Sequence, residues 1–134
     1  MKQLAFLFAG QGAQAVGMGA DFYRSHPAAS QVYDMGERIH PGTLDTCFFG
    51  DPKELNQTEN TQPCLYLTDL AIAAALSSEG VHPRAAAGFS LGEIPAAAFA
   101  GVFSHEDGFR FALQRGVAMA RAGEEHPGAM AAVL

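Results

Sequence analysis

The sequence predicts an α/β fold, with a mostly parallel sheet and flanking helices. Residues 4–9 form a short, continuously apolar run, which is typical of a parallel strand covered on both faces because polar and apolar residues do not alternate in it. A second apolar run, residues 85–87, leads into Gly88 after a long stretch with helical patterns. Strands separated by helical segments indicate parallel pairing, because a parallel connection must cross over the sheet. A signal peptide is the alternative for residues 1–15, but two glycines follow the apolar stretch at once, as in a turn after a strand.

Composition narrows the function classes. The 134 residues suit one domain, and 49% apolar against 16% charged residues excludes wholesale disorder. A net charge of −6 without a Lys/Arg run argues against nucleic acid or an anionic membrane surface as a partner. Asp69 interrupts the longest apolar run, which is therefore too short to cross a bilayer. Because Cys47 and Cys64 have neither the spacing of a metal site nor a disulfide framework, we expect a reducing, cytoplasmic location and no metal.

The helical segments carry start and stop signals. Pro27 lies near a helix start, Asp51 is placed as an N-cap, and Ser104 caps the last helix. Residues 63–79 are apolar around nearly the whole circumference, which predicts a buried helix that Gly80 ends. The predicted helices cover residues 21–39, 51–54, 63–79, 91–100 and 105–121.

The strongest chemical signal is Gly88-Phe89-Ser90-Leu91-Gly92, a G-x-S-x-G motif between a predicted strand and a predicted helix. This is the context of a nucleophile elbow, in which a strained turn exposes the serine hydroxyl and leaves the backbone N–H of Leu91 free to stabilise an oxyanion. Residues 90–93 also fit a capping box, in which the hydroxyl would only cap a helix. Ser90 is thus a candidate nucleophile, with a structural role as the alternative.

A glycine-rich segment, residues 10–15, follows the first predicted strand. It fits the dinucleotide-binding pattern G-x-G-x-x-A. That pattern needs an acidic residue about twenty positions on, at the end of a second strand, whereas Asp34 and Glu37 stand in a helical pattern. The alternative is that the backbone N–H of Gln11 contributes to an oxyanion hole.

Five segments, in this order, resemble the malonyl-CoA:acyl carrier protein transacylases. They are residues 8–14, 61–63, 88–93, 115–119 and 128–133. The resemblance implies that Ser90 takes a malonyl group from coenzyme A and that the N–H groups of Gln11 and Leu91 form the oxyanion hole. It also implies that Arg115 binds the free carboxylate of the malonyl unit. The implied activity passes malonyl to the phosphopantetheine thiol of acyl carrier protein in fatty acid synthesis, with no cofactor beyond the malonyl-CoA substrate.

Helix geometry supports a special role for Arg115 independently. Phe111, Arg115 and Met119 lie one turn apart, beside the main apolar stripe of the last predicted helix. An arginine on an apolar flank must find an anion or return its head group to water. A carboxylate ligand fits the planar guanidinium well, and a structural salt bridge to an internal Asp or Glu is the alternative.

The resemblance covers less than half of a transacylase. It implies that residues 1–126 are part of the large α/β-hydrolase-like subdomain of an acyltransferase, here incomplete. Residues 127–134 would be the first strand leading into a missing small subdomain. None of the five histidines has a context that matches the catalytic histidine of the family, which would come after Leu134. We therefore expect the isolated chain to be an inactive fragment, or the remainder of the enzyme to be a second chain.

Three residues depart from the family pattern. Phe89 replaces the histidine before the nucleophile, Ile94 stands where tyrosine is frequent, and Pro95 is expected to kink the helix after the motif. Phe89 removes a polar group beside the acyl site. The sequence therefore predicts the type of reaction more firmly than the identity of the acyl group. The other functions that the residues allow are a serine esterase or thioesterase with the same elbow, and a dinucleotide-binding module.

Overall fold

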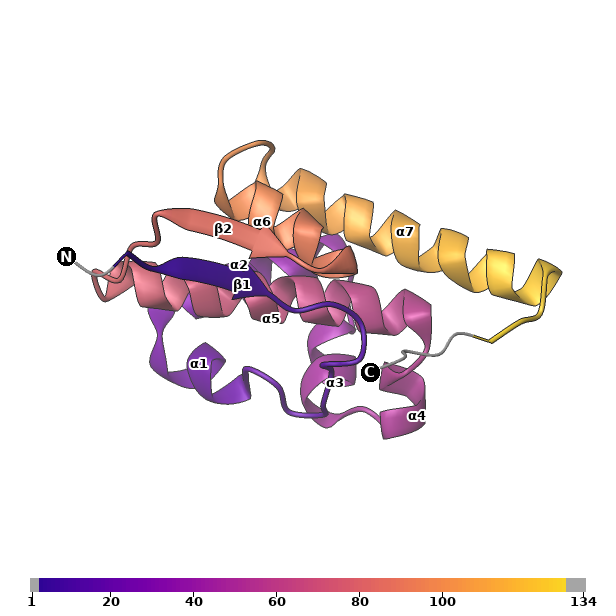
Figure 1. Ribbon diagram of the computed structural model, residues 1–134. Helices are drawn as coiled ribbons and strands as arrows, with labels where there is room; N and C mark the ends of the chain where they lie inside the picture. The colour runs from indigo at the N-terminus through magenta and orange to yellow at the C-terminus, as the bar shows by residue number, and fades with distance from the viewer. Residues whose placement is uncertain (1–2, 130–134) are drawn as a thin grey trace.

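The protein consists of helices and a small, two-stranded parallel sheet, as a computed structural model shows for residues 3–129 (Figure 1). The strands β1 (Ala5–Phe8) and β2 (Ala85–Gly88) pair in parallel, with Ala5 opposite Ala85 and Phe8 opposite Gly88. The helices are α1 (Ala20–Ser25), α2 (Pro27–Ile39), α3 (Thr43–Phe49), α4 (Pro52–Leu55), α5 (Thr58–Ser78), the 3-10 turn η1 (Ser90–Gly92), α6 (Glu93–Phe99) and α7 (His105–Glu125). The predicted α/β class with a parallel sheet and flanking helices is confirmed.

The helix α5 is the centre of the fold. Helices α2 and α7 pack along it, and in Figure 1 it runs behind the two strands. Its buried side chains point in all directions and include Tyr66, Leu67 and Leu70, so the predicted buried helix is confirmed. It begins at Thr58, earlier than predicted, which places Pro63 inside the helix.

Helices α5 and α7 approach closely at a glycine. A Cβ atom on Gly116 would lie 2.9 Å from the Cα atom of Glu59, a distance that only glycine tolerates. Further along the same interface, the Tyr66 hydroxyl donates a hydrogen bond of 2.8 Å to the carbonyl oxygen of His105. The close approach brings Arg115, the neighbour of Gly116, against the first turns of α5.

Two helix predictions are confirmed in detail and two are corrected. The Asp51 side chain accepts the Lys53 N–H at 2.7 Å, and the Ser104 hydroxyl accepts the Asp107 N–H at 3.0 Å, so both predicted N-caps are present. The segment predicted as one helix over residues 21–39 is two helices, because the residue before Pro27 is driven into an extended conformation. Pro95 does not kink α6, because it lies in the first turn, where its missing N–H has no helical partner.

The prediction that β1 is covered on both faces is wrong for residues 3–129. Phe6 and Phe8 pack against Phe99 of α6, with ring centroids 5.5 Å and 5.7 Å away. Leu7 points to the other face and is 81% exposed, because no other described element packs there. The strand predicted within residues 127–134 falls on residues 130–134, outside the described residues, so that division of the chain stays a prediction.

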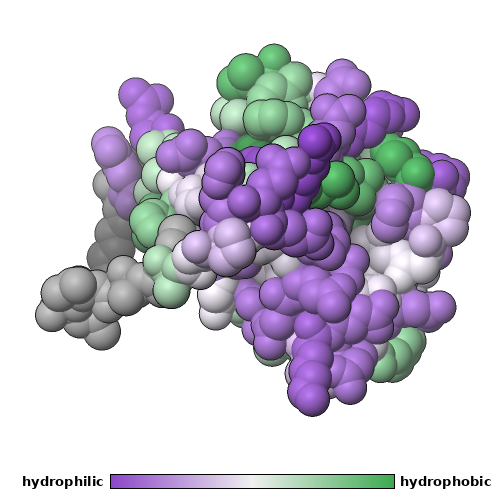
Figure 2. Space-filling view, turned by 90° about the vertical axis from the view of Figure 1, so that its right-hand side faces the viewer, coloured by the Kyte–Doolittle hydropathy of each residue, from purple (hydrophilic) through white to green (hydrophobic). Residues whose placement is uncertain are grey.

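The surface is mixed in character. On the end of the molecule where α7 finishes, hydrophilic groups dominate and apolar groups form separate patches (Figure 2). In the part of the chain that the structure describes, no helix has both the length and the apolarity to span a bilayer.

One carboxyl group is buried beside the sheet. A cavity of about 290 Å³ lies between β1 and α5, and Asp69 lines it together with apolar side chains. The Oδ2 atom of Asp69 is buried and has no hydrogen-bond partner within residues 3–129. Burial raises the pKa of Asp69 to about 7, although the backbone N–H of Ala9 acts in the opposite direction.

Asp69→Asn is therefore expected to stabilise the chain in a pH-dependent way. The folded state holds the Asp69 proton more tightly than the unfolded state, so this group lowers the free energy of unfolding as the pH rises from about 4 to about 7. Asparagine stays neutral at every pH. The free energy of unfolding of Asp69→Asn should therefore exceed that of the wild type by about 2 kcal/mol at pH 8, and the two should be nearly equal at pH 4. Urea unfolding at both pH values measures it, with the exposed Asp45→Asn as control. An equal effect of Asp69→Asn at both pH values would contradict the raised pKa.

Candidate active site

The turn after β2 has the strained geometry of a nucleophile elbow. Ser90 has φ +54°, the only non-glycine residue with a positive φ in the described chain. A Cβ atom on Gly88 would collide with the Gly92 carbonyl, and one on Gly92 would collide with the Phe8 carbonyl of the neighbouring strand. The two glycines of the motif are thus required by the close backbone approach around Ser90.

The hydroxyl of Ser90 is presented outward and does not cap a helix. The residue is exposed, and its Oγ atom accepts a hydrogen bond of 3.3 Å from Nη2 of Arg115. The N–H of Glu93 bonds to the backbone carbonyl of Ser90, and no side chain caps η1 or α6. The capping-box interpretation is therefore wrong, because the hydroxyl is turned toward α7.

Arg115 carries a charge without an acidic partner among the residues that the structure describes. Its Nη1 atom donates a 2.8 Å hydrogen bond to Oε1 of Gln62, and Nη2 donates to Ser90. Neither acceptor is charged, and the salt bridges among residues 3–129 do not include Arg115. The alternative of a structural salt bridge is contradicted, since a half-buried guanidinium held only by neutral oxygens remains free to bind an anion.

The loop after β1 lies beside this turn. Because the strands are parallel, their carboxyl ends meet at one edge of the sheet, and the Phe89 N–H donates to the Phe8 carbonyl at 3.2 Å. The Gln11 side chain donates to Thr58 at 2.7 Å, and the Gln14 side chain donates to Asn56 at 2.8 Å. The side-chain amide of Gln11 is thus directed toward Thr58 of α5. The group of Gln11 that is available to the site is its backbone N–H.

The dinucleotide-binding interpretation of residues 10–15 does not fit this loop. No helix begins at the glycines, since α1 starts only at Ala20. Asp34 and Glu37 lie in α2, where Asp34 accepts from the Tyr23 hydroxyl and Glu37 accepts the N–H groups of Gly42 and Leu44. Both carboxylates thus have structural partners, and no strand end brings either one to the loop.

Comparison with known proteins decides the family. The model of the acyl transferase domain family matches residues 5–134. The chain belongs to this family. It is 39% identical over 135 residues to a malonyl CoA-acyl carrier protein transacylase of Bacillus subtilis, and 41% identical over 130 residues to that of Synechocystis. The match covers 100% and 97% of this chain but 43% of each relative, so the chain spans about two fifths of their length.

Solved structures of this acyl transferase family have the same fold. The Synechocystis malonyl-CoA:ACP transacylase superposes with a TM-score of 0.85 at 40% identity, over 90% of this chain and 41% of that one. The Clostridium perfringens transacylase superposes with a TM-score of 0.83 at 38% sequence identity. The match covers 88% of this chain and 38% of that one. The resemblance drawn from five sequence segments is confirmed, as is its restriction to part of a transacylase.

Gln62 is a residue of the candidate site in this acyl transferase domain that the sequence did not single out, although it contacts Arg115. It is fully buried on α5, yet its amide joins Arg115 and the Sδ atom of Met119, which accepts from Nε2 at 3.2 Å. A glutamine inside an otherwise apolar helix was the available signal, since a buried amide needs partners. Its partners lie more than fifty positions along the chain, and no local pattern reveals them.

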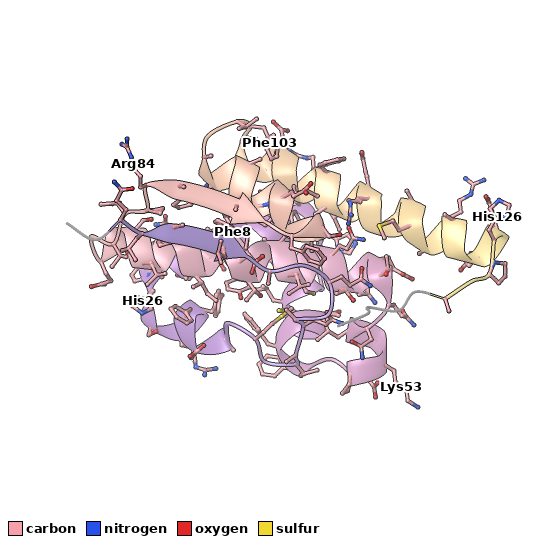
Figure 3. The ribbon with its side chains drawn as sticks, viewed as in Figure 1. Phe8, His26, Lys53, Arg84, Phe103 and His126 are labelled. Atoms are coloured by element: carbon pink, nitrogen blue, oxygen red, sulfur yellow. The ribbon has the colours of Figure 1, made fainter. Side chains whose placement is uncertain are left out.

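Within residues 3–129, no histidine is hydrogen-bonded to Ser90. His40 contacts Thr43 at 3.0 Å, and His26 lies 3.9 Å from the Glu79 carboxylate. Figure 3 shows His26 by α1 and His126 at the far end of α7. The same residues contain no group of three or more His, Cys, Asp or Glu side chains that could hold a metal ion.

Ser90→Gly is expected to raise the free energy of unfolding by about 1 kcal/mol, because glycine adopts a positive φ without strain. Urea denaturation measures this gain. The control, Ser30→Gly inside α2, should lower stability by a similar amount, because glycine weakens a helix interior. Destabilisation by both substitutions would contradict the strained turn.

Proposed function

We propose that this chain carries the acyl-serine centre of a malonyl-CoA:acyl carrier protein transacylase. The observation that carries the proposal is the hydrogen bond from Arg115, a cation without an acidic partner in residues 3–129, to the exposed hydroxyl of Ser90. A nucleophile and a carboxylate receptor side by side suit an acyl group that ends in a carboxylate. The names of the Bacillus subtilis and Synechocystis relatives support the same reaction.

In the first half-reaction, the Ser90 oxygen attacks the thioester carbonyl of malonyl-CoA. A carbon–oxygen bond forms, the carbon–sulfur bond breaks, and coenzyme A leaves as its thiol. The backbone N–H groups of Gln11 and Leu91 would stabilise the oxyanion of the tetrahedral intermediate. Arg115 would hold the far carboxylate of malonyl in a bidentate contact, which fixes the carbonyl near Oγ.

In the second half-reaction, the phosphopantetheine thiol of acyl carrier protein attacks the malonyl ester. The new carbon–sulfur bond forms as the carbon–oxygen bond breaks, and Ser90 recovers its proton. In the first half, a base must accept the Ser90 proton and pass it to the departing sulfur of coenzyme A. In the second half, the same base must accept the proton of the phosphopantetheine thiol and pass it to the Ser90 oxygen. We propose that this base is a histidine of the remainder of the enzyme, on the same or a second polypeptide.

The surroundings of the reaction follow from the same proposal. The partners are a coenzyme A thioester and acyl carrier protein, the location is the cytoplasm, and no cofactor is needed beyond the substrate. A similar structure with a TM-score of 0.84 at 32% identity is described as a type II PKS acyl-carrier protein in complex with its malonyl-transacylase, which supports the carrier as acceptor. Residues 1–126 would form part of the large subdomain and residues 127–134 the start of a small one.

Incubation with malonyl-CoA is expected to attach one malonyl group to Ser90. The measurement is intact-protein mass spectrometry followed by peptide mapping, on the protein at the full length that its reading frame encodes. Ser90→Ala should remain unmodified, whereas Ser25→Ala, which changes an exposed serine at the end of α1, should be modified normally. Malonylation at another residue, or none, would overturn the proposed function.

Arg115→Ala is expected to lower kcat/KM for malonyl-CoA by about 30-fold or more, because truncating one partner of a close charge pair costs about 2 kcal/mol or more. The value for acetyl-CoA should change little, since acetyl has no carboxylate. Arg110→Ala, on the exposed part of α7, is the control and should leave both values unchanged. A serine esterase with the same elbow would be indifferent to Arg115, so equal activity of Arg115→Ala and wild type on both thioesters would favour that alternative.

A further inference from the structure

We propose that Gln62 is a positioning residue that orients Arg115 without neutralising it, and thereby sets the preference for acyl groups that carry a carboxylate. This inference rests on the proposed function, because it concerns the selectivity of that same site. It goes further by assigning the selectivity to a buried amide on α5 that acts through Arg115.

The amide of Gln62 has one orientation that satisfies its neighbours. Oε1 accepts from Nη1 of Arg115 at 2.8 Å, and Nε2 donates to Sδ of Met119 at 3.2 Å. Arg115 and Met119 are one turn apart on α7, so Gln62 bridges two successive turns of the facing helix. The Gln62 side chain is fully buried, and the absence of a side chain at Gly116 lets the two helices approach closely near this level.

The hydrogen-bond partner of Arg115 on α5 is a neutral amide, and a carboxylate at the same position would change the charge of the site. Glutamate has nearly the shape of glutamine and would form a charge-assisted hydrogen bond with Arg115. The ion pair would stabilise the guanidinium at this position but cancel the positive charge that a substrate carboxylate needs. Glutamine holds Nη1 of Arg115 by a hydrogen bond but does not neutralise the guanidinium. The Nη2 atom therefore lies at Ser90 and can still attract an anion.

The consequence for substrates is a preference that depends on charge. A thioester of a dicarboxylic acid presents its distal carboxylate to Arg115, whereas a simple acyl thioester presents only a methyl group. Binding energy from the carboxylate contributes to the reaction only if the guanidinium is both oriented and uncompensated. Gln62 orients the guanidinium of Arg115 and, being neutral, leaves its charge uncompensated.

The decisive experiment compares Gln62→Glu with Gln114→Glu, which adds the same charge on the exposed face of α7. The readout is the ratio of kcat/KM for malonyl-CoA to that for acetyl-CoA, measured on the protein at its full natural length. Gln62→Glu should lower this ratio by about tenfold or more, through a higher KM for malonyl-CoA, while Gln114→Glu leaves it unchanged. In an Arg115→Ala background, Gln62→Glu should have no further effect on the ratio.

Folding is monitored separately by circular dichroism melts. Gln62→Glu should melt at or above the wild-type temperature, because the new ion pair replaces a neutral hydrogen bond. If Gln62→Glu fails to fold, Gln62→Met decides the question, since it keeps the volume and removes the acceptor. Gln62→Met should lower the malonyl-to-acetyl ratio severalfold, because Arg115 keeps its charge but loses its orientation.

The outcomes separate the two proposals. If the wild-type protein is not malonylated on Ser90, the proposed function fails and this inference fails with it. If the wild type is malonylated but the folded variants at position 62 keep the wild-type ratio, Gln62 is only a packing residue and this inference alone is overturned.

Discussion

The turn around Ser90 exists because two backbones meet at distances that only glycine allows. Gly92 lies against the carbonyl of Phe8 on β1, and Gly88 lies against the carbonyl of Gly92 itself. With no side chains at either position, the chain can reverse within three residues and leave Ser90 in a left-handed conformation. The cost of that conformation is of order 1 kcal/mol, and the surrounding sheet and helices must hold it in place.

A second constraint joins this turn to the rest of the molecule through α5. The helix is enclosed on nearly all sides, so its few polar side chains must find partners inside the protein. Gln62 finds Arg115 and Met119, while Thr58 at the start of the helix accepts from Gln11. One buried helix therefore positions both the cation beside Ser90 and the loop that follows β1.

Local signals predicted most of the fold. The motif glycines, the apolar run of β1 and the N-caps at Asp51 and Ser104 each depend on neighbours within a few positions, and the structure contains them all. The split between α1 and α2 was not predicted, although its cause is also local: Pro27 drives the preceding residue into an extended conformation, and this effect outweighs the helical pattern around it.

The site was predicted less completely, for a physical reason. Ser90 and Arg115 were selected by their local context, but the hydrogen bond between them joins residues 25 positions apart. Gln62 stands 53 positions from Arg115, and its burial depends on how α5 and α7 pack. The exposed face of Leu7 likewise depends on which elements are present to cover the sheet.

In the proposed acyl-enzyme, the free charge of Arg115 receives the far end of an acyl group esterified to Ser90. A crystal structure of the malonylated protein is the sharpest test of this arrangement. The malonyl carboxylate is expected on the guanidinium of Arg115, and the ester carbonyl oxygen is expected between the N–H groups of Gln11 and Leu91. A malonyl carboxylate directed into solvent, with Arg115 paired to an acidic side chain of the protein, would contradict it.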